Sequence, residues 1–262
     1  FMRILITGGT GLIGRSLCSL LLQKGHEIFV LSRNIIDAKN VLPSAIRILS
    51  YTDKIPLVEI VVNLAGESIS KKILTEKRLL EIEKSRIDLI DYLYYALKNN
   101  RPVQFIQASA ITMDNSCFAN ICQKVERRAQ KRFSMTNVCI ARFATVLSKK
   151  GGLIHYLSYL PKLNFLNGQN YVPYITLNDC IRALNIIIDE KLNDTVDICS
   201  DYQLNLQNLI LHFQHSKIIN TISLPLLKEA LFIDKRSSLL LIDKRIKPVK
   251  LLKNSMTFTN YI

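Results

Sequence analysis

The N-terminal segment is the sequence feature that most constrains the fold of this chain. Arg3 to Thr7 is an apolar run of strand length, and a glycine-rich turn and a segment with helical periodicity follow it directly. Gly8, Gly11 and Gly14 give this turn a G-x-x-G-x-x-G spacing. Small residues there permit a tight turn, close approach of a pyrophosphate to the backbone, and packing of the helix on the strand. The segment therefore predicts a strand–turn–helix unit that holds a dinucleotide at its helix N-terminus.

Short apolar runs alternate with helix-period segments over the first 145 residues. The expected strands are Arg3–Thr7, Glu27–Ser32, Ile46–Leu49, Glu59–Asn63, Val103–Ala108 and Asn137–Arg142, and the expected helices are Leu12–Lys24, Thr75–Lys98 and Phe118–Phe133. Each crossover is long enough for a right-handed return, so the pattern predicts parallel strands with helices on both faces. We expect an α/β fold with a doubly wound parallel sheet, the Rossmann fold.

The pattern becomes irregular after Arg142, and a helix over Leu177–Asp189 and a strand near Val196 then resume it. The rest is expected to be mostly helical, with a basic tail. We assign residues 1–145 with 176–199 to the nucleotide-binding core. Residues 146–175 with 200–262 are assigned to a small C-terminal substrate lobe, packed with the core as one unit.

Composition narrows the class of protein. Apolar residues make up 48% and charged residues 21%, as in globular proteins, and no apolar run approaches the roughly 18 residues of a membrane span. The six cysteines form no C-x-x-C pair, so we expect reduced thiols and no metal site. The chain enters its first strand at Arg3 without a cationic leader, and we expect a cytoplasmic protein.

The charge points to an anionic partner. Lys and Arg number 35 against 21 Asp and Glu, a net charge of +14. Cofactor phosphates, acidic sugar nucleotides, nucleic acid and anionic lipid satisfy this charge equally.

The end of the second strand bears on the choice of cofactor. NAD-specific sites place an acidic residue there to bind the adenosine ribose, whereas this strand ends in Ser32 and Arg33. A guanidinium binds a 2′-phosphate in bidentate fashion, and a serine hydroxyl adds a hydrogen bond. The sequence therefore favours NADP(H) over NAD(H), with an exposed strand-end arginine as the structural alternative.

Two further motifs connect the chain to a known family. Asn63-Leu64-Ala65-Gly66-Glu67 follows the fourth expected strand, and Ala108-Ser109-Ala110-Ile111 follows the fifth. With the glycine turn they resemble the extended short-chain dehydrogenase/reductases, and within these the NAD-dependent epimerase/dehydratase-like branch of nucleoside-diphosphate-sugar epimerases. The resemblance extends over nearly the whole chain, because this branch also has counterparts of Thr75–Arg78, Ser85–Ile87, Arg142, Gly151–Gly152 and Lys247–Leu252.

The resemblance implies a set of site residues. Gly8, Thr10, Gly11, Leu12, Ile13 and Gly14 would hold the pyrophosphate, Ser32 and Arg33 the adenosine phosphate, and Asn63, Leu64, Ala65 and Gly66 the path from adenosine to nicotinamide. Ser109 matches the family serine, and would face the nicotinamide or the substrate carbonyl as the catalytic residue.

The usual proton-transfer pair of this family is absent from the sequence. A tyrosine four residues before a lysine is expected on the helix Phe118–Phe133, where Val125 and Ala129 occupy the two positions. Met113-Asp114-Asn115 also replaces a tyrosine-glycine element. The candidate replacements for the missing proton carrier are Tyr156, Tyr159, Tyr171 and Tyr174 from the second lobe and Asp114 as a base.

The same helix carries a basic face. It consists of Lys124, Arg127, Arg128, Lys131 and Arg132, with Glu126 as its only acid. Such a stripe fits phosphate backbone, yet no aromatic platform accompanies it, and a solvated helix face is favoured over nucleic-acid binding. The resemblance implies that the long helix Thr75–Lys98 supports a homodimer interface, and intramolecular packing explains its apolar positions equally well.

The sequence thus yields two functional hypotheses. The leading one is an NADP(H)-binding reductase-like protein that acts as a nucleoside-diphosphate-sugar epimerase or oxidoreductase. The other is a catalytically inactive NADP(H)-binding sensor or interaction protein, which the missing tyrosine and lysine favour.

Overall fold

A seven-stranded parallel sheet forms the core of the computed structural model, which describes residues 1–67, 75–112, 116–148, 162–166, 169–213, 219–223 and 242–259. The strand order is β10-β6-β5-β4-β1-β2-β3. Their bounds are β1 Arg3–Thr7, β2 Glu27–Leu31, β3 Arg47–Leu49, β4 Ile60–Asn63, β5 Gln104–Ala110, β6 Asn137–Phe143 and β10 Asp194–Ile198. The order reverses at β1 and β4, so the predicted doubly wound Rossmann fold is confirmed.

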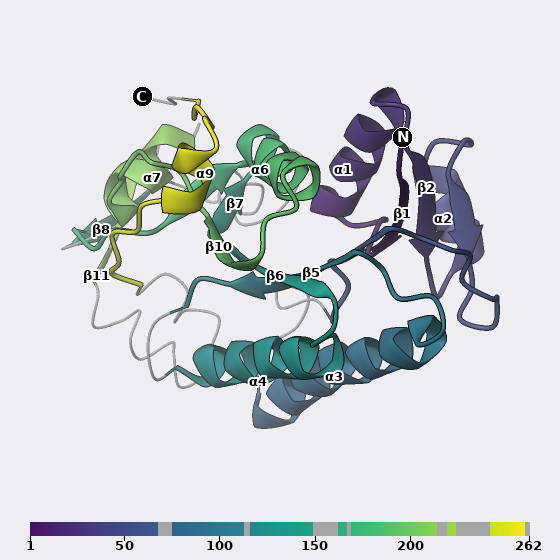
Figure 1. Cartoon of the computed structure of the whole chain (residues 1–262). Coiled ribbons are helices and arrows are strands. Elements are labelled where there is room, and N and C mark those ends of the chain that lie inside the picture. Colours follow the sequence, from purple (N-terminus) through teal and green to yellow (C-terminus); the bar gives the residue numbers. More distant parts are fainter. Residues whose placement is uncertain are drawn as a thin grey trace.

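Helices cover both faces of this sheet (Figure 1). α1 (Leu12–Gln23) and α6 (Leu177–Asp189) lie on one face, and α3 (Glu76–Leu97) and α4 (Cys117–Arg132) lie on the other. The short α2 (Ile35–Val41) follows β2. Two apolar cores result, one on each face of the sheet.

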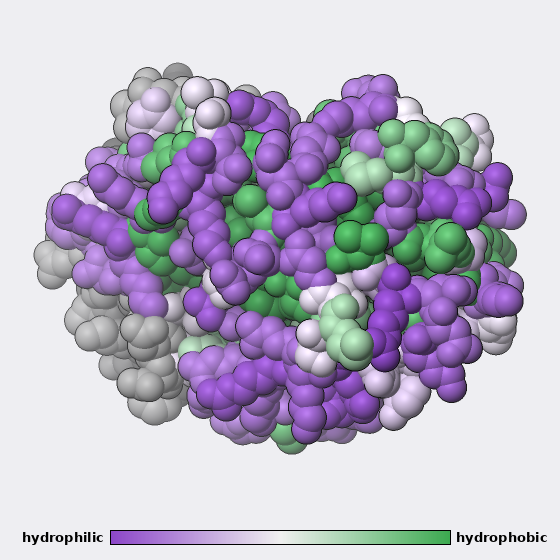
Figure 2. Space-filling view, in the orientation of Figure 1, coloured by the Kyte–Doolittle hydropathy of each residue, from purple (hydrophilic) through white to green (hydrophobic). Residues whose placement is uncertain are grey.

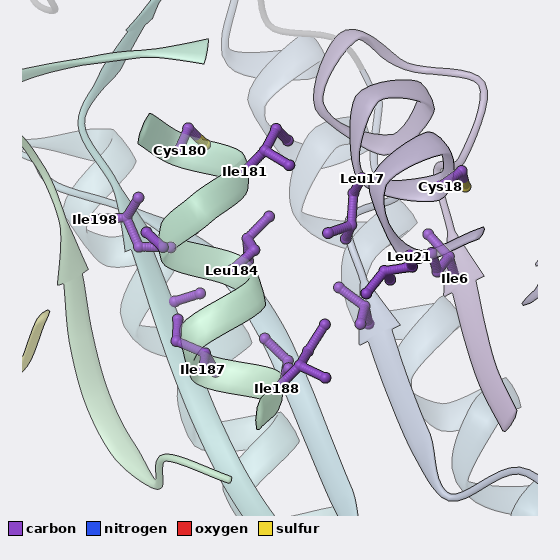
Figure 3. Packing of buried hydrophobic residues seen from close by; sticks show 14 of the residues in the cluster. Ile6, Leu17, Cys18, Leu21, Cys180, Ile181, Leu184, Ile187, Ile188 and Ile198 are labelled. Carbon is purple, nitrogen blue, oxygen red and sulfur yellow. The ribbon is translucent and has the colours of Figure 1, made fainter. Parts of the chain in front are cut away.

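The core between α1 and α6 is fully closed to solvent. Leu17 and Leu21 of α1 point toward Leu184 and Ile188 of α6, and all four side chains have no exposed surface (Figure 3). The two residues of each helix are four positions apart, which places them on one helix face. Burial of this face fixes both helices on the sheet.

The starts of the helices differ in a way that bears on binding. Thr75, Ser116 and Thr176 cap α3, α4 and α6 by accepting a backbone N–H with their hydroxyls. α1 begins after Gly11, which has no side chain to cap it. Its first N–H groups are therefore not satisfied by a capping side chain.

Among the residues that the structure describes, the C-terminal elements form two small strand pairs and two short helices. β7 (Thr145–Leu147) pairs with β9 (Tyr174–Thr176), and β8 (Lys162–Leu166) pairs with β11 (Ile219–Ser223). α7 spans Leu206–Phe213 and α9 spans Val249–Lys253. In the part expected to be mostly helical, α7 and α9 are helices, whereas β11 is a strand whose partner lies more than 50 positions earlier. In the part of the chain that the structure describes, we find no helix with the length and apolarity to cross a bilayer.

Candidate functional site

The glycine turn joins β1 to α1 through backbone positions that only glycine fits. Gly8 has φ +70°, and a Cβ on it would lie 2.8 Å from the backbone nitrogen of Ala65. A Cβ on Gly14 would collide with the carbonyl oxygen of Gly8. The Gly11 N–H donates to that same carbonyl at 3.0 Å, which closes the turn. The two outer glycines thus hold β1, α1 and the segment after β4 in close contact.

A cavity of about 410 Å³ opens above this turn, and we call it the glycine-turn cavity. It is lined by Gly8, Gly11, Leu12, Ile13, Gly14, Leu64, Ala108, Phe143, Thr145 and Val146. Because the uncapped N-terminus of α1 forms part of its wall, N–H groups and the positive end of the helix dipole face it. An anion of phosphate size fits this chemistry.

Most residues expected at the pyrophosphate line this cavity. Thr10 is exposed and does not. Asn63 is only 1% exposed, and its side chain is used inside the sheet. It accepts from the Thr7 hydroxyl at 2.5 Å and donates to Gln107 Oε1 at 2.7 Å. Asn63 thus connects β1 and β5 by hydrogen bonds. Its neighbour Leu64, and not Asn63, lines the glycine-turn cavity.

A second cavity, of about 400 Å³, lies at the end of β2, and we call it the tyrosine cavity. It is lined by Arg33, Tyr51, Ala65, Gly66, Glu67, Ser85, Asp88, Leu89 and Tyr92. The Tyr51 and Tyr92 rings lie 4.9 Å apart, and the Tyr92 hydroxyl donates to the Tyr51 carbonyl at 3.0 Å. Burial raises the pKa of both phenols, so the tyrosines present neutral aromatic surface to the cavity.

Arg33 reaches this cavity beside a carboxylate that the sequence prediction did not use. Its guanidinium, 78% exposed, lies 3.2 Å from one Glu67 oxygen, while Arg78 binds the other at 2.8 Å. These hydrogen bonds, first from Arg78 and then from Arg33, lower the pKa of Glu67. The predicted partner Ser32 donates its hydroxyl to the Asn34 carbonyl at 3.0 Å.

Ser109 lies on β5, where its hydroxyl contacts an acid from α4. Ser109 Oγ is 2.6 Å from Glu126 Oε1, and Arg142 binds both Glu126 oxygens at 2.8 and 2.7 Å. The bidentate arginine marks an ionised carboxylate, so Ser109 is the donor. The expectation that Glu126 lies on the outward basic face is wrong. The side chain is only 7% exposed, because it turns toward the sheet to meet Arg142 and Ser109.

A third cavity, of about 290 Å³, adjoins this cluster, and we call it the carboxylate cavity. Its lining includes Ala110, Cys122, Glu126, Arg142, Asp197 and Lys244. Burial raises the pKa of the Cys122 thiol and also that of the half-buried Asp197 carboxyl. Glu126 and Asp197 are the functional candidates that the sequence reasoning missed. The sequence signal for Asp197 is a carboxylate placed between two apolar strand residues, Val196 and Ile198.

The positions of the absent tyrosine and lysine are packed in the core. Val125 is 1% exposed and Ala129 has no exposed surface. Of the candidate replacements, Tyr174 is buried, and Tyr171 stacks under the Arg245 guanidinium at 3.7 Å. Neither is among the lining residues of the three cavities. Tyr156, Tyr159, Asp114 and Gly151–Gly152 lie outside the described residues.

The basic face of α4 is largely paired with α3. Lys124 binds Glu83 at 3.0 Å, and Arg128 and Arg132 both bind Asp91. Hydrophilic residues dominate the surface over both helices (Figure 2). Three of the five basic residues therefore serve helix–helix packing, which supports the solvated-face interpretation. Within the described ranges, no group of three or more His, Cys, Asp or Glu side chains is arranged to hold a metal ion.

Comparison with known proteins bears on the family. The model of the NAD dependent epimerase/dehydratase family matches residues 4–117. An epimerase family protein of Staphylococcus saprophyticus is 29% identical, covering 69% of this chain and 68% of its own length. One of Bacillus subtilis is 26% identical, covering 72% and 70%. The predicted resemblance to the epimerase/dehydratase family is confirmed.

Solved structures of this family share the fold. Human epimerase family protein SDR39U1, crystallised with NADPH, superposes with a TM-score of 0.81 at 19% identity, over 98% of this chain and 95% of that one. UDP-glucose 4-epimerase of Thermus thermophilus, in complex with NAD, gives 0.73 at 13% identity, over 97% and 93%. At these identities the likeness shows a common fold, the Rossmann fold.

Proposed function

We propose that this chain binds NADP(H) along the carboxyl edge of the sheet and acts on a sugar nucleotide as an epimerase or oxidoreductase. The observation that carries the proposal is the glycine turn, whose close-packed glycines and uncapped helix open onto the glycine-turn cavity. The relatives named epimerase family proteins and the NADPH and NAD in the titles of two structural neighbours support it. The dinucleotide, when bound, supplies a nicotinamide ring that takes or gives a hydride.

The residues of this chain divide the binding task by position. Backbone N–H groups at the start of α1, between Gly11 and Gly14, would hold the pyrophosphate. Ala65 and Gly66 would let the adenosine pass close to the backbone after β4, and the rings of Tyr51 and Tyr92 offer it an apolar wall.

The charges at the tyrosine cavity favour the phosphorylated cofactor. Glu67 is shared by two arginines, and the more buried Arg78 holds it at the shorter distance. Arg78 also pairs with Glu81 at 2.8 Å, whereas Arg33 is 78% exposed and contacts Glu67 through one nitrogen at 3.2 Å, so most of its guanidinium stays open to a ligand in the cavity. A 2′-phosphate has the charge and the oxygen acceptors to bind there.

An inactive nucleotide-binding sensor or interaction protein is the second candidate. Val125 and Ala129 favour it, because neither side chain transfers a proton and both are enclosed in the core. A cytoplasmic location and a homodimer remain predictions from the sequence.

Fluorescence titration with NADPH and NADH tests the proposal. The wild type should bind NADPH more tightly, and Arg33→Gln should reduce NADPH binding toward that of NADH. Arg47→Gln is the matched control, because Arg47 is also an exposed, Glu-paired arginine but lies outside the three cavities. Equal binding of the two nucleotides, or binding of neither, would contradict the role of Arg33 in binding the 2′-phosphate.

Product analysis on a panel of sugar nucleotides then separates the two candidates. Epimerised or oxidised products from the nucleotide-loaded protein support the enzyme. Binding without any product supports the sensor.

A further inference from the structure

Three polar side chains stand in line across neighbouring strands at the carboxyl end of the sheet. Ser109 of β5 pairs in register with Arg142 of β6, and Arg142 pairs in register with Asp197 of β10. Residues paired in this way project from the same face of a sheet. Here that face is covered by α4, from which Glu126 reaches Ser109 and Arg142.

The two carboxyl groups of this cluster have different surroundings. Glu126 accepts one hydrogen bond from Ser109 and two from Arg142, so its acceptor sites are largely engaged. Among the described residues, none donates a hydrogen bond to the Asp197 carboxyl or forms an ion pair with it within 4 Å. Asp197 nevertheless lines the carboxylate cavity together with Glu126 and Arg142. One acid is fixed, and the other is available to a ligand.

We propose that the carboxylate cavity is an acid–base site for a secondary alcohol or its ketone, in which Asp197 carries the proton and Glu126, Arg142 and Ser109 are positioning residues. The inference rests on the proposed nucleotide binding for its hydride partner. It assigns a proton carrier to a chain that lacks the tyrosine and lysine of its family.

The electrostatics of Asp197 agree with this role. Burial is the largest influence and raises the pKa of its carboxyl. Glu126 on α4 raises it further, whereas the cations of three other elements lower it: Arg142 on β6, Lys250 on α9 and Lys244 in the segment before α9. The thiols of Cys122 and Cys199 are the other titratable groups beside this cluster, and burial raises the pKa of both. A raised pKa makes the Asp197 carboxylate a stronger base and so a better proton acceptor.

The chemical step balances in both directions. In oxidation, the C–H bond of the alcohol breaks and its hydride goes to the oxidised nicotinamide dinucleotide. The O–H bond breaks, its proton passes to the Asp197 carboxylate, and a C=O bond forms. In reduction, the Asp197 carboxylic acid returns the proton to the oxygen of the ketone as a hydride arrives from the reduced dinucleotide.

The first test uses the nucleotide-free protein. Carboxyl ¹³C NMR of the full chain, with the Asp197 signal assigned by its loss in Asp197→Asn, should show a titration midpoint above the usual aspartate value of about 3.9. Glu126→Gln should lower that midpoint, because it removes a neighbouring negative charge. A midpoint at or below the usual value overturns the proposal.

The second test measures turnover of secondary alcohols and ketones with NADP⁺ and NADPH. Asp197→Asn should reduce kcat by at least about 10²-fold, the usual contribution of a general acid or base, with NADPH affinity unchanged. Glu126→Gln should shift the acid limb of alcohol oxidation to lower pH, an effect that a purely structural role would not produce. Asp194→Asn is the matched control, because Asp194 lies on the same strand and is 82% exposed.

The outcomes separate this inference from the proposed function. Turnover by Asp197→Asn within about threefold of wild type, or no turnover by a protein that binds NADPH, overturns the role of Asp197. Failure to bind either nucleotide instead removes the proposed function, while the NMR titration still reports on the acid–base site.

Discussion

Glu67 lies between two arginines at the tyrosine cavity, and replacing it with glutamine tests how the cofactor preference is set. A 2′-phosphate that binds Arg33 must displace the Glu67 carboxylate, 3.2 Å away. At that distance in water, the Coulomb attraction of two unit charges is about 1.3 kcal/mol. Exposed pairs retain at most about 1 kcal/mol of this, because both side chains must be ordered. Removal of the competing charge is therefore worth up to about 1 kcal/mol, or about fivefold in affinity.

We expect Glu67→Gln to strengthen NADPH binding by two- to fivefold, by the same argument from the exposed ion pair, and to leave NADH binding unchanged. The gain should decline as salt is added, because the competing ion pair is screened. Nucleotide fluorescence titrations at low and moderate ionic strength measure both effects. Glu81→Gln is the control, because Glu81 pairs with Arg78 and not with Arg33. Equal gains for NADPH and NADH, or an NADPH affinity that does not change, would refute the displacement argument.

Three further variants test the binding turn, the core and a helix contact. In Gly11→Ala the new methyl group enters the wall of the glycine-turn cavity but meets only the Gly8 carbonyl, at 3.3 Å, so NADPH affinity should fall about tenfold, or 1.4 kcal/mol, while the melting temperature changes little. Leu184→Ala should cost about 2–5 kcal/mol in urea denaturation, because the side chain is fully buried; a cost below 1 kcal/mol would contradict the packing. Burial raises the pKa of Asp91, but hydrogen bonds from Arg128 and Arg132 outweigh it and lower the pKa overall. Asp91→Asn should therefore lose about 1–2 kcal/mol of stability above about pH 4, and the difference from wild type should vanish as the pH falls through the folded pKa; a difference that does not shrink as the pH is lowered would contradict this.

Local pattern was sufficient for the central sheet because each strand there is an apolar run between turn signals. β1 has the predicted bounds, and the other predicted strands differ by one or two residues at their ends. α2 was missed because it is only seven residues long, and its start depends on the Asn34 side chain accepting the Asp37 N–H. β8 and β11 lie outside the reach of local pattern, since each exists only as the partner of the other.

Some residues of the candidate site could likewise be predicted from local sequence, and others could not. Glycines and strand ends are local features, so the sequence located the turn and Arg33. Glu126 was misplaced because its neighbours along the helix are basic, whereas its contacts lie on β5 and β6. Asp197 was not predicted as a site residue, because only the register of β6 with β10 brings it beside Arg142.

Side-chain hydrogen bonds from Thr7 through Asn63 to Gln107 connect β1, β4 and β5. They fix the distance between the glycine turn and the cluster around Ser109. β1 carries the glycine turn, and β5 and β6 carry Ser109 and Arg142, so their separation is a whole number of strand spacings. Two steps of about 4.8 Å separate β1 from β5 and three separate it from β6, so the strands of Ser109 and Arg142 lie about 10 Å and about 14 Å from β1, held by backbone hydrogen bonds rather than by helix packing. Substitutions on α3, α4 or in the segments after β10 can therefore change the chemistry at one end without moving the phosphate-binding turn at the other. Protein engineering or natural selection can therefore vary the carboxylate cavity while the nucleotide-binding glycine turn stays in place.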